Sequence, residues 1–125
     1  MGHAMLLAAL LLAGTAAIEV EQDIGPGDRV LARWPGDALL YPARVQKVTG
    51  DAVQVAFDDG DIAAVPERDV KPMTWTVGTR LQCNWQNKGT YYGGVVGAMD
   101  GETITFQYDD GDRETMTISR CRQNG

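Results

Sequence analysis

The sequence FDDGD at residues 57–61, which returns as YDDGD at residues 108–112, decides the fold of this chain. In each copy an aromatic residue closes an alternating, strand-like run, and Asp and Gly follow it. Asp and Gly tolerate the positive φ angles of tight hairpin loops, so each copy predicts a turn between two β-strands.

The two copies stand 51 residues apart, and other residues repeat at the same offset without a gap. The matching pairs are Trp34 and Trp85, Tyr41 and Tyr92, Arg29 and Arg80, Gly27 and Gly78, Val45 and Val96, and Gly50 and Gly101. The sequence therefore predicts a duplicated domain, which we interpret as a duplicated binding module.

Five short strands separated by turn residues are expected in each repeat. The apolar residues alternate along them, as in Val53, Val55 and Phe57, so that one face of each strand points to a core. A single helical turn is expected at residues 66–69. The pattern predicts an all-β chain of two tandem five-stranded SH3-like barrels after an N-terminal apolar segment.

The domain boundaries follow from the offset. We expect the first repeat at residues 26–72, a connector at 73–76 and the second repeat at 77–123. Because the connector is short, the two barrels should touch, with Trp75 packed between them. Arg29 and Arg80 are expected to pair with acidic turn residues.

Residues 4–17 form an uncharged, apolar run that ends in small residues. This is typical of a secretory signal peptide over residues 1–17, cleaved near Ala17 and followed by a linker at 18–25. The run is short for a membrane span. No Lys or Arg precedes it, which leaves a membrane anchor or a mis-assigned start codon as alternatives. The signal-peptide hypothesis predicts a secreted or periplasmic protein.

Cys83 and Cys121 are the two cysteines of the chain, in the first and last strands of the second repeat. These strands pair in a five-stranded SH3-like barrel, so we expect a disulfide, formed in an oxidising compartment. Two buried thiols are the alternative. With so few cysteines, and His3 as the sole histidine, no metal site is expected.

Charge and composition narrow the function. The net charge of −6 argues against nucleic acid as a partner, since that binding depends on Lys and Arg, and suits a cationic partner. A chain without His3 has no histidine to act as a general base, and Ser119 is its sole serine. We therefore expect no enzyme activity and no cofactor.

The motif Arg-x-Trp, then Tyr-Pro-Ala-x-Val, then Val-x-Phe-Asp-Asp-Gly-Asp resembles the Tudor and Agenet-like family. The resemblance covers residues 27–71 and 78–122, as a tandem pair. It implies aromatic cages that bind methylated lysine or arginine. Carried over by position, the better cage is in the second repeat: Trp85, Tyr92 and Tyr108, with Asp110 and Asp112. The weaker cage is in the first: Trp34, Tyr41 and Phe57, with Asp59 and Asp61.

The chemistry of such a cage is independent of the family. A methylated ammonium group is attracted to π faces, and carboxylates nearby add Coulomb attraction. The expected partner is thus a protein or peptide with a cationic or methylated side chain, or a small cationic ligand. One alternative is a structural domain of the cell envelope whose aromatic residues lie in the core. Another, if the N-terminus is not a signal, is a reader of methylated histone-type proteins.

Overall fold

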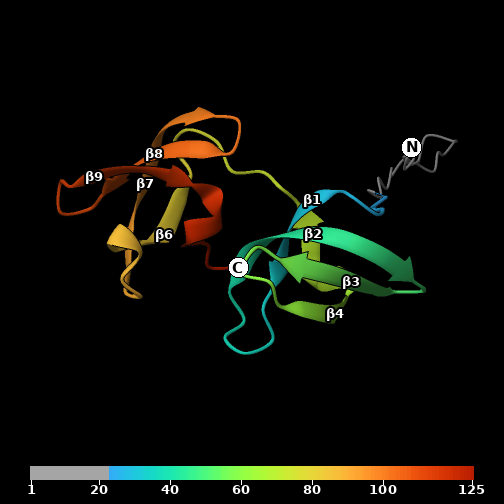
Figure 1. Ribbon diagram of the computed structural model, residues 1–125. Coiled ribbons are helices and arrows are strands. Elements are labelled where there is room, and N and C mark those ends of the chain that lie inside the picture. The colour runs from blue at the N-terminus through green and yellow to red at the C-terminus, as the bar shows by residue number, and fades with distance from the viewer. Residues whose placement is uncertain (1–22) are drawn as a thin grey trace, which may run out of the picture.

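The computed structural model describes residues 23–125. Over this range the chain folds as two five-stranded antiparallel sheets, one for each repeat (Figure 1). The predicted signal peptide lies outside the described residues. Within residues 23–125, no helix has the length and apolar character needed to span a bilayer.

The first repeat contains five strands in the sheet order β4-β3-β2-β1-β5. The strands are β1 (Arg29–Arg33), β2 (Leu40–Thr49), β3 (Ala52–Phe57), β4 (Ile62–Pro66) and β5 (Val70–Pro72). The expected helical turn is a short 3-10 helix, η1 (Glu67–Asp69). The first and last strands pair, as predicted for an SH3-like barrel.

The second repeat has the equivalent sheet order β10-β6-β7-β8-β9. Its strands are β6 (Arg80–Asn84), β7 (Tyr91–Asp100), β8 (Thr103–Tyr108), β9 (Arg113–Thr117) and β10 (Cys121–Arg122). Two 3-10 helices, η2 (Trp85–Asn87) and η3 (Ile118–Arg120), follow β6 and β9. The predicted all-β fold is confirmed.

The duplication extends to the backbone. In the two hairpins, the amide of Phe57 donates to the carbonyl of Asp61 and the amide of Tyr108 to that of Asp112, each at 2.8 Å. The glycines of the two turns, Gly60 and Gly111, have φ angles of 102° and 101°. This conformation is accessible to glycine without strain, which explains the turn sequence.

The equivalent tryptophans also occupy equivalent places. The amide of Trp34 donates to the carbonyl of Leu39 at 2.9 Å, and that of Trp85 to Thr90 at 3.1 Å. Residues that are 51 positions apart in the sequence therefore occupy equivalent positions in the two barrels.

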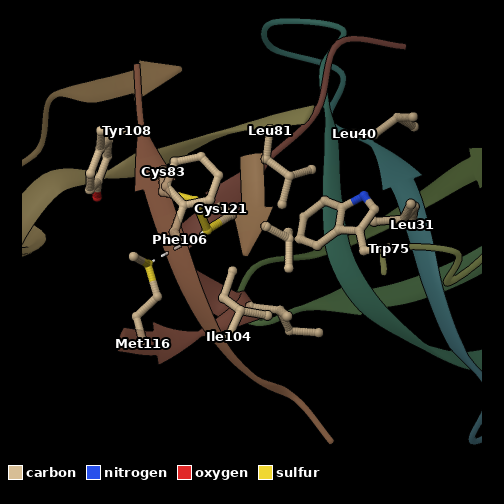
Figure 2. Close-up of a cluster of buried hydrophobic side chains, with 12 residues drawn as sticks. Leu31, Leu40, Trp75, Leu81, Cys83, Ile104, Phe106, Tyr108, Met116 and Cys121 are labelled. Atoms are coloured by element: carbon tan, nitrogen blue, oxygen red, sulfur yellow. Dashed lines mark hydrogen bonds between the residues drawn. A yellow bond between two sulfur atoms is a disulfide. The ribbon is translucent and has the colours of Figure 1, made fainter. Parts of the chain in front are cut away.

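Two hydrophobic cores result from the alternation. The first holds Val30, Ala32, Ala43, Val45, Val53, Val55, Phe57, Val65 and Val70. The second holds Leu81, Cys83, Val96, Ile104, Phe106, Tyr108, Met116, Ile118 and Cys121. Three residues from outside the second repeat complete this second core, namely Leu31, Leu40 and Trp75 (Figure 2).

These three residues form the apolar contact between the barrels. Leu31 and Leu40 lie on the outer face of the first barrel, and both are buried because Trp75 and the second barrel cover them. The indole nitrogen of Trp75 donates to Gln123 Oε1 at 3.0 Å. The backbones of Leu40 and Gln123 also exchange two hydrogen bonds of 2.9 Å. The prediction that Trp75 packs between touching barrels is confirmed.

Arg29 adds a polar contact between the barrels. Its guanidinium donates two hydrogen bonds of 2.6 Å to Asp58 and two, of 2.9 and 3.2 Å, to Glu102 of the second barrel. Ser119 donates to the same Asp58 carboxylate at 2.5 Å. Burial opposes ionisation of Asp58, but the bonds from Arg29 and Ser119 outweigh it and lower its pKa. In the second repeat, Arg80 pairs with Asp109, so both predicted ion pairs are present.

The predicted disulfide joins Cys83 to Cys121. The two residues lie directly opposite each other in the pairing of β6 with β10, with Cα atoms 4.1 Å apart, and both are buried. The bond ties the short last strand to the first strand of the same barrel.

Candidate functional site: an aromatic pocket in the second repeat

The structure brings the five cage residues predicted in the second repeat together around one pocket of about 210 Å³. The lining residues are Trp85, Tyr92, Tyr108, Asp110 and Asp112. Trp85 follows β6, Tyr92 lies in β7, and Tyr108 ends β8. The two aspartates belong to the hairpin that joins β8 to β9. Residues from two strands, one 3-10 helix and one turn thus meet at the mouth of the barrel.

The three rings differ in exposure, and this difference shapes the pocket. Tyr92 is 50% exposed and forms an outer wall, whereas Tyr108 is 5% exposed and forms the inner wall. Phe106 packs edge-on against Tyr108, with ring centroids 4.9 Å apart, and fixes it from the core side. Trp85 is half-buried. The pocket therefore offers an open side for a ligand and a rigid aromatic interior.

Hydrogen bonds hold the acidic turn against the rings. The indole nitrogen of Trp85 donates to Asp112 Oδ2 at 3.0 Å. The amide of Asp112 donates to Asp110 Oδ1 at 2.9 Å, which fixes the turn itself. The carboxylate of Asp112 is thus placed at the rim while its charge remains available to a cation.

Glu114 in β9 supports the inner wall, and the sequence analysis did not identify it. Tyr108 donates its hydroxyl proton to Glu114 Oε1 at 2.7 Å, and Arg120 donates to Oε2 at 2.7 Å. The amide of Gln86 donates to the same carboxylate. The equivalent residue in the first repeat is Ala63. This difference between the repeats, a glutamate in place of an alanine, is the sequence feature that could have identified Glu114.

The network shifts two pKa values in opposite directions. Burial, with the bond to Glu114, raises the pKa of Tyr108 well above its ordinary value, so the phenol stays neutral. Burial opposes ionisation of Glu114, but the bonds from Arg120 and Tyr108 prevail and lower its pKa. At neutral pH the inner wall therefore consists of a neutral phenol held by an ionised, arginine-paired carboxylate.

The loop after Trp85 carries a cation of its own. Lys88 places its ammonium group 5.2 Å from the centroid of the Trp85 ring. Gln86 and Asn87 adopt positive φ angles of 52° and 57° to make this tight turn. The Trp85 ring thus already takes part in a cation–π contact.

The cage residues predicted in the first repeat are arranged differently. The Phe57 ring is 5% exposed and contacts Trp34 and Tyr41 edge-on, with centroids 5.3 and 6.5 Å apart. Gly36 lies so close to the Trp34 indole that a Cβ there would be 2.5 Å from Nε1. These three rings pack against one another and against their own loop.

The polar atoms of this first set are also engaged elsewhere. The Tyr41 hydroxyl donates to Asp37 Oδ2 at 2.5 Å and accepts from Arg122 of the second barrel at 3.1 Å. Asp59 and Asp61 are exposed in the hairpin, where the Asp61 amide donates to Asp59 Oδ1 at 3.0 Å. Among the hydrogen bonds of residues 23–125, none joins Asp61 to the indole of Trp34. The contact that orients Trp85 thus has no counterpart here.

Comparisons with known proteins agree with this architecture. Residues 26–73 match the family model described as the Tudor domain of the DNA repair protein Crb2. The crystal structure of the Crb2 tandem Tudor domains is similar to the chain with a TM-score of 0.57, at 19% identity over 78% of this chain and 77% of that one. The first repeat thus matches a Tudor family model, and the chain as a whole shares the fold of a tandem Tudor pair.

Two tandem Agenet structures are also similar to this chain. One is ADCP1 tandem Agenet domain 3-4, with a TM-score of 0.41 at 14% identity, covering 81% of this chain and 80% of that one. The other is AGDP1 AGD34 of Arabidopsis thaliana, with a TM-score of 0.43 at 14% identity, covering 81% and 82%. No curated protein matches this chain.

Proposed function

We propose that this tandem Tudor chain is a non-enzymatic binding module whose second domain binds a methylated ammonium group on a peptide or a small ligand. The observation that carries the proposal is the pocket in which Trp85, Tyr92 and Tyr108 face one space with two carboxylates at its rim. Each aromatic contact with a desolvated cation contributes roughly 0.5–2 kcal/mol.

The pocket suits a methylated cation better than a free ammonium. Three of its five lining residues are aromatic, and the indole N–H of Trp85 and the hydroxyl of Tyr108 already donate to Asp112 and Glu114. A primary ammonium could donate to the rim carboxylates, but it would lose its remaining hydrogen bonds to water against the aromatic walls. A methylated ammonium has fewer such bonds to lose and gains the π faces.

The experiment is a calorimetric titration of a trimethyl-lysine peptide and its unmodified twin into the whole chain. The wild-type protein is expected to bind the methylated peptide more tightly. Tyr92→Ala is expected to weaken this binding by about 2–30-fold, the loss of one cation–π contact. Tyr41→Ala, the matched change in the first repeat, is expected to leave it unchanged. Equal binding of both peptides, or full binding by Tyr92→Ala, would contradict the proposal.

The buried and edge-on packing of Phe57 with Trp34 and Tyr41 favours a structural role for the first aromatic set. On this proposal the first domain serves as a docking platform for the second. Trp34→Phe is then expected to lower stability while leaving ligand affinity unchanged.

We further propose that the protein is exported, because residues 4–17 are apolar and uncharged. Cell fractionation combined with N-terminal sequencing tests this. A mature chain that begins near Ile18 in a secreted or periplasmic fraction is expected. A full-length chain that co-purifies with nuclear proteins would instead favour the histone-type reader.

A further inference from the structure

A second, larger groove of about 700 Å³ lies on the outer face of β10, β6 and β7. Its charge is opposite to that of the aromatic pocket, because the charged side chains that line it are arginines. The residues that matter here are Arg80, Gln82, Tyr91, Gly93, Arg122 and Asn124. The C-terminal end of the chain, which contributes Asn124, lies between the two barrels in Figure 1.

Arg122 in this groove is held in a defined orientation. Its guanidinium stacks over the Tyr91 ring at 3.8 Å from the centroid. Its Nε donates to Gln82 Oε1 at 2.9 Å, and its Nη1 donates to the Tyr41 hydroxyl at 3.1 Å. Three neutral partners therefore fix the position of this cation.

Arg122 nevertheless lacks a counter-ion within the described part of the chain. Between residues 23 and 125, no carboxylate lies within 4.0 Å of it, and its Nη2 donates no hydrogen bond. By contrast, several other arginines each pair with a carboxylate: Arg29, Arg33, Arg44, Arg80 and Arg120. A pre-oriented guanidinium with free donors is well suited to a carboxylate from outside, which it binds in the plane of its N–H groups.

The duplication indicates that this face of the barrel can pack against a partner. The 51-residue offset places Gln82 and Tyr91 where the first repeat has Leu31 and Leu40. In the first repeat this face is apolar and is covered by Trp75 and the second barrel. In the second repeat the same face is polar and forms the groove. The same surface is thus an internal interface in one copy and an open one in the other.

The charged residues around the groove indicate which kind of partner it binds. An adjoining depression shares Asn124 with the groove and adds Arg33, Arg68 and Lys71. Of the carboxylates nearby, Asp69 and Asp109 are already paired with Arg33 and Arg80, and Asp37 accepts a hydrogen bond from Tyr41. The result is a short basic strip in a chain whose net charge is −6.

We infer that this groove binds an acidic peptide segment, with one of its carboxylates on Arg122 and its amide groups against Gln82 and Asn124. A long polyphosphate strand suits it less, because the strip is short and the rest of the acidic chain would repel further phosphates. The inference does not depend on the methylammonium pocket, which binds the opposite charge.

The test uses a fluorescein-labelled hexaglutamate peptide and fluorescence anisotropy with the whole chain. Saturable binding that weakens with added salt is expected for the wild type. Gln82→Glu supplies Arg122 with an internal carboxylate of the same shape, so binding is expected to weaken at least tenfold. Gln107→Glu adds the same charge on β8, outside the groove, and is expected to weaken binding less than threefold.

Arg122→Gln provides a second variant that removes the cation itself, with an expected loss of at least tenfold. Circular dichroism verifies that each variant is folded. No saturable binding by the wild type, or equal losses for Gln82→Glu and Gln107→Glu, would overturn the inference. Tighter binding of a single-stranded oligonucleotide, lost in Gln82→Glu, would replace the peptide with a nucleic acid and would also overturn it.

Discussion

Trp85 donates its indole proton to Asp112 across the rim of the pocket at 3.0 Å, whereas the equivalent pair, Trp34 and Asp61, shares no such bond. The substitution Asp112→Asn keeps an oxygen acceptor for the indole and removes the negative charge. We expect it to weaken binding of a trimethyl-lysine peptide by about 1 kcal/mol, or roughly fivefold, through lost Coulomb attraction.

The measurement is calorimetry at low and high salt. The difference between wild type and Asp112→Asn should shrink at high salt, since screening removes the same attraction. Asp61→Asn is the matched control and should bind like the wild type. A deficit in Asp61→Asn as large as that in Asp112→Asn would place the ligand elsewhere.

The disulfide between Cys83 and Cys121 closes a loop with a sequence separation of 38. Restriction of the unfolded chain by a loop of this length is expected to stabilise the fold by about 4 kcal/mol. The double variant Cys83→Ala/Cys121→Ala should therefore unfold at a lower urea concentration. Because both sulfurs are buried, a thiol reductant should leave the folded wild type unchanged until urea opens it. Rapid reduction of the native protein would contradict this.

Trp75 connects the two cores, and its removal should separate their unfolding. Trp75→Ala is expected to destabilise the chain by about 3–5 kcal/mol, the usual cost of truncating a buried aromatic residue. Since Trp75 contacts both barrels, we also expect the single unfolding transition to divide into two. Calorimetric unfolding measures both effects. Trp34→Phe, a change within the first barrel, should keep one transition.

Glu114 should make the free energy of unfolding depend on pH. Its pKa in the folded protein lies below its ordinary value of 4.5, so its contribution is present above that value and is lost as the pH falls through the folded pKa. Urea midpoints at pH 7 and pH 3 should therefore differ more in the wild type than in Glu114→Gln. Identical pH dependence in the two proteins would show that the network around Tyr108 is not ionised as described.

The sequence predicted those features that depend on local pattern and on the repeat. The hairpins, the strand pairing that places Cys83 beside Cys121, and the ion pairs of Arg29 and Arg80 all follow from turn chemistry and the 51-residue offset. The resemblance to the Tudor family, rather than the local pattern, predicted the grouping of Trp85 with Asp112.

Features that depend on how one barrel lies on the other were not predictable in this way. Leu31 alternates onto the outer side of β1 and is buried because Trp75 and the second barrel cover it. Tyr41 was predicted as a cage residue from its position, but its hydroxyl accepts a hydrogen bond from Arg122 of the second barrel. Glu114 supports Tyr108 through a contact that a repeat pattern does not contain, since the first repeat has Ala63 in its place.

The near-identical conformation of the turns at Gly60 and Gly111 has a practical consequence for engineering. Side chains that flank these two turns can be exchanged between the halves at equivalent positions without remodelling of the turn backbone. Installing Phe57→Tyr and Ala63→Glu together would transplant the phenol–carboxylate support into the front half. A few substitutions would then give a chain with two binding pockets, which binds a peptide with two modified side chains by avidity.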